Sequence, residues 1–252
     1  MRKKIIAGNW KMNKTAGDAR SLVADIMKLS VDASKAHVII IPPQVYLSEF
    51  GSLSKANGVS IGAQNSYPKN EGAFTGEVSA YILKSLGVEY CLVGHSERRK
   101  YFGEADLDCL EKVNALLEQG LTPILCVGEE LSVREEGKHF DHVKKQLLAV
   151  LTSVTPTELT KIIIAYEPVW AIGTGKTATT QQASEMHSYI RQLISDQFDA
   201  KIASQVYVLY GGSVNDANAK ELMSANDIDG VLVGGASLIF TSFEKIISAV
   251  KS

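Results

Sequence analysis

The stretch Lys161-Ile-Ile-Ile-Ala-Tyr166 decides the fold: it is a short, continuously apolar run, and a longer stretch with helical spacing, Thr179–Phe198, follows it. A run without polar alternation is typical of a strand that is buried on both faces of a parallel sheet. Seven similar runs stand elsewhere in the chain, at Lys4–Gly8, Val38–Ile41, Val59–Ala63, Tyr90–Val93, Pro123–Val127, Val206–Tyr210 and Gly230–Val233.

These strands alternate with helices along the whole chain. Eight strands in 252 residues are spaced by about 31 residues, close to the length of one strand–helix–strand unit. No linker, low-complexity run or change of composition divides the chain. The sequence therefore predicts a single α/β domain over residues 1–252, folded as a (β/α)8 barrel of eight parallel strands ringed by helices; an open doubly wound sheet is the alternative.

The helix candidates include Asp18–Ser30, Ala105–Gln119, Thr179–Phe198 and Asp216–Ser224. Gly120 follows Ala105–Gln119 as a C-terminal cap would. The spacing within this helix predicts one buried stripe, made of Leu107, Leu110, Val113 and Leu117.

Composition and charge exclude several classes of protein. Twenty-six basic and 28 acidic side chains leave a net charge of −2, without the basic excess of a general nucleic-acid binder. No apolar run approaches the ~20 residues that a membrane helix needs. Lys11 and Lys14 interrupt any signal-peptide core, and three separated cysteines, Cys91, Cys109 and Cys126, fit reduced thiols. We expect a cytoplasmic protein without nucleic-acid or membrane partners.

Polar residues and glycines follow most of the strands directly. They are Asn9 and Lys11, Gln64, His95 and Glu97, Glu167, and the pairs Gly211-Gly212 and Gly234-Gly235. In a closed parallel barrel the carboxyl ends of all strands meet at one face, where barrel enzymes keep their active sites. We therefore expect these residues to converge, although each taken singly has a structural explanation.

Glu167 and His95 are the candidate acid–base groups. Glu167, partly desolvated by apolar neighbours such as Ile172 and Leu232, would gain basicity and act as a general base toward a carbon acid. His95, at the start of a helix, would stay neutral and polarise a carbonyl. Lys11 beside Asn9 would anchor substrate oxygens, and Glu97 would pair with Lys11.

Two further features suggest phosphate binding and a lid. Backbone N–H groups at the glycine pairs can hold a phosphate dianion, the alternative being ordinary turn geometry. The connection Pro168–Lys176 is longer than most strand–helix loops. With proline at one end and glycines near the other, it suits a loop that moves on hinges, the alternative being a static loop.

Nucleotide and metal sites are less well supported by the sequence. Gly173–Thr177 resembles the end of a phosphate-binding loop, but Trp170 stands where that motif requires glycine. His139 and His142 share a helical spacing, yet no third ligand is clearly placed. We expect no metal and no cofactor.

Five motifs together resemble the triosephosphate isomerase family, in order from the first strand to the last helix. They are Asn9-Trp-Lys-Met-Asn13, Gly94-His-Ser-Glu-Arg-Arg99, Ala165-Tyr-Glu-Pro-Val-Trp-Ala-Ile-Gly-Thr-Gly-Lys176, Tyr210-Gly-Gly-Ser213 and Leu232-Val-Gly-Gly-Ala-Ser237. The resemblance implies a glycolytic isomerase, also serving gluconeogenesis and the pentose phosphate shunt. It would interconvert dihydroxyacetone phosphate and D-glyceraldehyde 3-phosphate through an enediolate, without metal or cofactor. The alternatives are another phosphate-binding barrel enzyme, of the aldolase or synthase type, and a non-enzymatic binding barrel.

The resemblance also implies a role for each site residue. Glu167 would be the base, His95 the neutral electrophile and Lys11 the electrostatic stabiliser, oriented by Asn9. Ser96 would hold Glu167 in the open site. Phosphate would be held by Gly173, Ser213, Gly234 and Gly235.

Family likeness further implies a moving lid and a homodimer. The lid would comprise Pro168, Val169, Trp170, Ala171, Ile172, Gly173, Thr174, Gly175 and Lys176. When closed, it would be braced by Tyr210 at Ala178 and by Ser213 at Gly175. The segment 64–77 resembles the family's dimer loop, with Thr75 reaching toward the partner subunit, and Arg191 with Asp227 resembles a structural ion pair.

Overall fold

Eight parallel strands close into a barrel in the computed structural model, which describes residues 2–53, 58–172 and 177–251. The strands pair in chain order, and β1 closes the circle by pairing with β8 through Ile5 opposite Gly230. The barrel is therefore closed, not an open sheet. The strands are β1 (Lys4–Asn9), β2 (Ala36–Ile41), β3 (Val59–Ala63), β4 (Tyr90–Val93), β5 (Thr122–Val127), β6 (Ile163–Tyr166), β7 (Tyr207–Tyr210) and β8 (Gly230–Val233).

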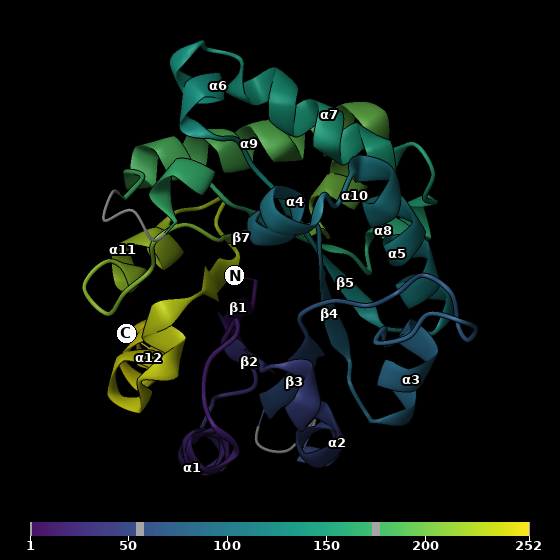
Figure 1. Cartoon of the computed structure of the whole chain (residues 1–252). Helices are drawn as coiled ribbons and strands as arrows, with labels where there is room; N and C mark the ends of the chain where they lie inside the picture. The colour runs from purple at the N-terminus through teal and green to yellow at the C-terminus, as the bar shows by residue number, and fades with distance from the viewer. Residues whose placement is uncertain (1, 54–57, 173–176, 252) are drawn as a thin grey trace.

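Helices surround the strands on all sides (Figure 1). In that view α7 and α9 lie above the barrel, and α1 and α2 lie below it. The helices are α1 (Ala16–Met27), α2 (Leu47–Phe50), α3 (Ala80–Ser85), α4 (Ser96–Phe102), α5 (Asp106–Glu118), α6 (Leu131–Glu135), α7 (His139–Leu151), α8 (Pro156–Leu159), α9 (Thr180–Gln197), α10 (Ala200–Ala203), α11 (Ala219–Ser224) and α12 (Phe240–Ser248).

Local sequence explains where these elements begin. Thr179 caps α9 reciprocally, because its side chain accepts from the Gln182 N–H and the Gln182 side chain accepts from the Thr179 N–H. Strand β6 starts later than the apolar run suggests. The N–H groups of Lys161 and Ile162 bond back to Glu158 and Leu159, so these residues complete the turn after α8.

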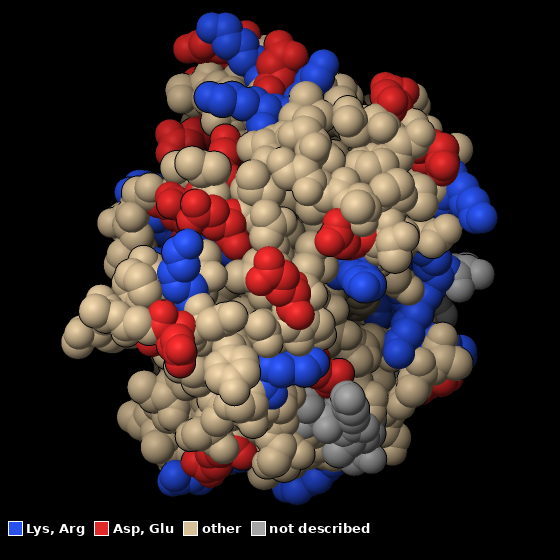
Figure 2. Space-filling view, turned by 90° about the vertical axis from the view of Figure 1, so that its right-hand side faces the viewer, with Lys and Arg blue, Asp and Glu red and all other residues tan. Residues whose placement is uncertain are grey.

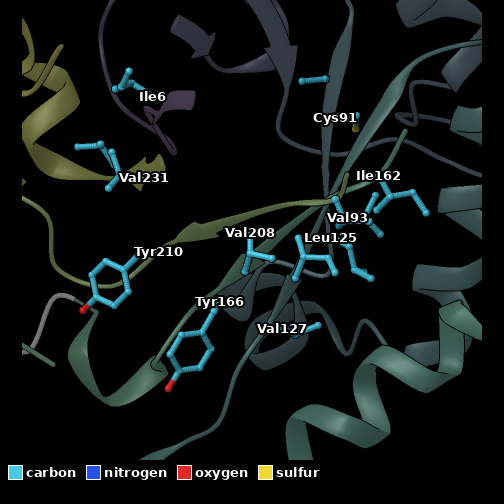
Figure 3. Packing of buried hydrophobic residues seen from close by; sticks show 14 of the residues in the cluster. Ile6, Cys91, Val93, Leu125, Val127, Ile162, Tyr166, Val208, Tyr210 and Val231 are labelled. Atoms are coloured by element: carbon cyan, nitrogen blue, oxygen red, sulfur yellow. The ribbon is translucent and has the colours of Figure 1, made fainter. Parts of the chain in front are cut away.

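Two apolar layers hold the barrel together. Side chains pointing inward fill the barrel itself, among them Ile39, Leu92, Ile124 and Leu209. Side chains pointing outward pack beneath the helices, and Figure 3 shows part of this larger layer, with Ile6, Val93, Leu125, Val208 and Val231 labelled. Because every strand is covered on both faces, its sequence is continuously apolar, as the runs in the sequence indicated.

The predicted stripe on α5 is wrong in part. Val113 is buried and Leu110 and Leu117 are half-buried, but Leu107 is 66 % exposed. The face that packs on the barrel is made instead of Cys109, Lys112, Val113, Ala115 and Leu116. Lys112 occupies this inner face because its ammonium bonds the buried carboxylate of Glu104 at 2.7 Å. The predicted end of the helix is correct, since Gly120 has a φ of +66° just beyond it.

Charges of both signs are interspersed on the face of the molecule in Figure 2. Arg191 contacts Asp227 at 3.5 Å, so the expected ion pair is present, and Arg191 also bonds Asp229. All three cysteines are free and buried. None of the helices in the described part of the chain is both long enough and apolar enough to span a membrane.

Candidate active site

The carboxyl ends of the strands enclose a cavity of about 470 Å³. Its walls bring together most of the residues that follow the strands in sequence. They include Asn9, Lys11, His95, Glu167, Ile172, Gly211, Gly212, Ser213, Leu232, Gly234 and Gly235. Of the expected phosphate-binding residues, Gly173 lies outside the described residues, as do Thr174, Gly175 and Lys176 of the expected lid.

Lys11 reaches this cavity through an unusual backbone conformation. Its φ is +52°, in the left-handed region that residues with a side chain rarely adopt. Neighbouring groups hold it there: the Asn9 side chain accepts from the Lys11 N–H at 3.0 Å, and Gln64 donates to the Lys11 carbonyl at 2.8 Å. The ammonium bonds the Glu97 carboxylate at 2.6 Å, which is the pairing expected from sequence. Strain of this kind persists only where surrounding contacts impose it, and it is concentrated at functional sites.

His95 precedes α4, and its hydrogen bonds identify its protonated nitrogen. Nδ1 accepts the Glu97 N–H at 3.2 Å, so the ring proton resides on Nε2. Nε2 lies 3.0 Å from Oε1 of Glu167. The imidazole therefore points its N–H at the carboxylate, and both side chains are almost fully buried.

Glu167 follows β6 and is held by two groups. Besides His95, the backbone N–H of Ser96 donates to Glu167 Oε2 at 2.9 Å. Ser96 thus holds Glu167 as the resemblance suggests, through its backbone at the start of α4. Ile172 and Leu232, the expected apolar neighbours, both line the same cavity.

The pKa of Glu167 shifts in the opposite direction from the sequence-based expectation. Burial raises the pKa of Glu167, but the contacts with His95, the Ser96 N–H and Lys11 outweigh burial, and the net shift is downward. Burial likewise works to lower the pKa of His95, whereas the adjacent Glu167 carboxylate raises it, and here the carboxylate prevails. While the two side chains touch, Glu167 is a stabilised carboxylate and His95 is drawn toward its charged form.

The glycine pairs have different local roles. A Cβ on Gly211 would lie 2.9 Å from Cγ of Glu167, and one on Gly212 would lie 2.2 Å from the Tyr210 hydroxyl, so both positions require glycine for close approach. A Cβ on Gly235 would meet nothing within 4 Å. Gly211 and Gly212 therefore make room for protein side chains, while Gly234 and Gly235 leave the wall of the cavity open.

Glu129, which sequence reasoning missed, anchors the first part of the expected lid. Its fully buried Oε1 accepts from the Tyr166 hydroxyl at 3.1 Å, the Trp170 indole at 2.9 Å and Arg134 at 3.1 Å. Its carbonyl accepts the Val169 N–H at 3.0 Å. The signal was available, because Glu129 stands just past β5, the position at which the other site residues follow their strands.

Thr75 lies apart from this cavity, in an exposed segment after β3. His142 bonds Gln146 on the same helix rather than His139. Within residues 2–53, 58–172 and 177–251, no group of three or more His, Cys, Asp or Glu side chains is placed to hold a metal ion.

Comparison with known proteins extends the likeness to the whole chain. The family model for triosephosphate isomerase matches residues 4–250. A triosephosphate isomerase of Cytophaga hutchinsonii is 49% identical over 240 residues, which cover 94% of this chain and 95% of that protein. The triosephosphate isomerase of Caldanaerobacter subterraneus is 49% identical over 98% of this chain and 100% of its own length. One from Porphyromonas gingivalis is 47% identical over 99% of this chain and 100% of its own length. With the closed barrel and the residues at its mouth, these matches establish that the chain belongs to the triosephosphate isomerase family and is an isomerase.

Proposed function

We propose that this isomerase interconverts dihydroxyacetone phosphate and D-glyceraldehyde 3-phosphate through an enediolate. The observation that carries the proposal is the buried pair of Glu167 and His95, 3.0 Å apart in a cavity that Lys11 also lines. A carboxylate, an N–H donor and an ammonium are the three groups needed to move a proton between adjacent carbons while negative charge develops on oxygen.

In this mechanism Glu167 removes a proton from the carbon next to the carbonyl and returns it to the neighbouring carbon. His95 donates its Nε2–H to the carbonyl oxygen as charge develops there, and Lys11, oriented by Asn9 and Glu97, stabilises that charge. Glu167 must first leave His95 and Ser96. Its departure removes the largest contact that raises the pKa of His95 and leaves burial and Lys11, which lower it, against the smaller effect of Glu97, which raises it. His95 would therefore meet the substrate as a neutral imidazole.

The phosphate would lie at the opposite side of the cavity, on the backbone N–H groups of Ser213, Gly234 and Gly235. Gly173 would complete this site when Pro168–Lys176 closes. Closure of this lid would exclude water and protect the enediolate from losing phosphate. No metal or organic cofactor enters these steps.

The test is isomerisation of D-glyceraldehyde 3-phosphate by the purified chain and by its Glu167→Gln variant, coupled to a dehydrogenase that consumes dihydroxyacetone phosphate. Loss of the base should lower kcat by about 10²- to 10⁴-fold. Glu111→Gln, on the exposed side of α5, is the control and should keep full activity. Equal activity of Glu167→Gln and the parent chain would refute the assignment of the base.

We further propose that the chain acts as a homodimer in the cytoplasm, residues 1–252 forming one functional unit. Met12, Val45, Phe74 and Phe102 are exposed apolar side chains. Beside the catalytic mouth, Lys11, Met12, Gln64, Glu97 and Phe102 help to line a cavity of about 290 Å³. The Thr75 segment of a second copy would fill this cavity. Exposed apolar side chains of this kind mark interaction surfaces, which supports a dimer that buries them.

Sedimentation of the parent chain and of Thr75→Arg tests the dimer. The arginine should shift the chain toward monomer and lower activity, because the partner segment borders Lys11. Thr157→Arg, at an exposed position on α8, should leave the dimer intact. A parent chain that is monomeric at micromolar concentration would overturn this part of the proposal.

A further inference from the structure

At the amino ends of the strands, which we call the floor of the barrel, the inward-facing side chains differ in chemical type from those deeper in the interior. Along each strand alternate side chains point inward, and Ile39, Leu92, Ile124 and Leu209 form part of an aliphatic interior. The inward positions two residues earlier, at the amino ends of β2, β4, β5 and β7, carry hydrogen-bonding side chains instead: His37, Tyr90, Thr122 and Tyr207. All four side chains are only partly buried, so their polar groups remain accessible at the amino end of the barrel.

These side chains border a cavity of about 300 Å³ on the face opposite the catalytic mouth. We call it the floor cavity. Its aliphatic wall is made of Ile5, Ile162 and Ile163, and Thr160 completes the lining with the residues above and two lysines, Lys3 and Lys161. The cavity therefore combines apolar walls, aromatic rings, hydroxyl groups and ammonium groups.

Some polar groups of the floor cavity are hydrogen-bonded to each other, and others have no partner in the part of the chain that the structure describes. The Tyr90 hydroxyl lies 3.1 Å from Nε2 of His37, and the two rings are 5.6 Å apart. Burial and Lys3 lower the pKa of His37, and burial raises the pKa of Tyr90 to about 12, so this hydrogen bond joins two neutral side chains. The hydroxyls of Thr122 and Tyr207 find no hydrogen-bond partner within the described residues, and they are free to donate to a ligand.

The charge at the floor cavity is positive. Lys3 and Lys161 make no ion pair within 4 Å of any described carboxylate, although Glu158 interacts with Lys161 at longer range, and no described residue of the lining is acidic. Glu89 influences His37 and Tyr90 electrostatically, but it accepts the Ser60 hydroxyl at 2.8 Å and does not line the cavity. Two ammonium groups at an otherwise apolar and aromatic cavity favour an anion that also carries an apolar body.

We propose that the floor cavity binds a small planar organic anion of the aromatic carboxylate class. Its ring packs against Tyr90 and Tyr207 and the isoleucine wall. Its carboxylate faces Lys3 and Lys161 and accepts from the free hydroxyls. Because the packed side chains of the barrel interior separate this site from the mouth of the barrel, occupancy stabilises the fold and does not compete with substrate.

Calorimetric titration with benzoate, benzamide and benzylamine tests the ligand class, since the three probes share a ring and differ in charge. Benzoate should bind once per chain and raise Tm, whereas the neutral amide and the cation should bind at least about tenfold more weakly. Benzoate should leave the KM for triose phosphate unchanged. Equal binding of all three probes, no binding of benzoate, or competition with substrate would each overturn the proposal.

Variants locate the site. Lys161→Gln should weaken benzoate binding by about tenfold through loss of a charge-assisted contact. Tyr207→Phe, which removes only a hydroxyl, should weaken it by a smaller factor. Lys144→Gln, on the exposed side of α7, is the matched control and should bind as the parent does. Unliganded melts of each variant exclude misfolding, and equal losses in Lys161→Gln and Lys144→Gln would refute this location.

Discussion

The contact between Glu167 and His95 sets the charge of both side chains before substrate arrives. It stabilises the carboxylate and raises the pKa of the imidazole, although burial acts against both effects. A base stored in this way is fully ionised but is paired with the group that must later act as a neutral donor. Substrate binding therefore has to separate the two side chains as well as position the reacting carbon.

The decrease of kcat/KM at acid pH should reflect the contact between Glu167 and His95 in the free enzyme. Because the pKa of Glu167 is lowered, the carboxylate survives to a lower pH than an ordinary glutamate, and kcat/KM of the free enzyme should fall only at correspondingly acidic pH. His95→Asn removes the strongest contact that lowers this pKa, so the acid limb should move to higher pH. If kcat/KM of the parent and of the variant fell at the same acid pH, the proposed coupling between His95 and Glu167 would be contradicted.

Gly211 is the second residue on which the position of the base depends. In Gly211→Ala the new methyl would lie 2.9 Å from Cγ of Glu167, and the side chain of the base must shift. A misplacement of about 1 Å costs about 10²-fold in rate, and we expect a loss of that order in kcat. Gly17→Ala, whose Cβ meets nothing within 4 Å, is the control. An active Gly211→Ala would mean that Glu167 tolerates displacement.

At the scale of elements, the strands could be predicted from sequence because each is buried on both faces and is therefore continuously apolar. That Asn9, His95 and Glu167 lie close together could also be predicted, because each follows a strand and the carboxyl ends of the strands meet at one face of the barrel. Helix α5 was harder, because apolar spacing does not reveal that Lys112 turns inward to Glu104 while Leu107 faces outward. The direction of the Glu167 pKa shift was also out of reach, since it depends on contacts with His95 and Ser96 across the barrel.

The connection after β6 begins with an anchored turn. Its first turn, Val169–Ala171, is fixed to Glu129 by both side-chain and backbone hydrogen bonds. Trp170→Phe keeps an aromatic ring of smaller size and removes the indole N–H that Glu129 accepts. One hydrogen bond is worth about 1 kcal/mol net, so kcat should fall by about fivefold. The share of turnovers that end in phosphate release should rise, and an unchanged share would argue against a role for this anchor in closure.

At the scale of the whole molecule, buried titratable groups tie stability to pH. His187 is fully buried between α9 and the barrel; its Nδ1 lies 3.1 Å from the Asp227 carbonyl, and the Tyr166 ring is 6.0 Å away. Burial lowers the pKa of His187 to about 3. The native protein thus keeps this imidazole neutral at pH values where an unfolded chain would protonate it.

The unfolding free energy should therefore decline as pH falls from about 6.5 toward 3. Between those values the unfolded state binds one more proton at this site, which contributes a slope of at most about 1.4 kcal/mol per pH unit. The lowered pKa of Glu167 acts in the same direction at more acid pH. Urea unfolding at several pH values should show a shallower slope in His187→Gln, whatever its absolute stability. Parallel slopes would exclude His187 as the source.

The pairing of β1 with β8 has a consequence for folding during synthesis of the chain. Strand β1 leaves the ribosome before the other seven strands, yet one of its two neighbours, Gly230–Val233, is the last of the eight to be synthesised. Until then the growing sheet has two unpaired edges, the condition under which nascent chains associate wrongly. The barrel therefore cannot close until β8 has been synthesised, and a ribosome that stalls short of residue 230 leaves an open sheet with two edges exposed to aggregation.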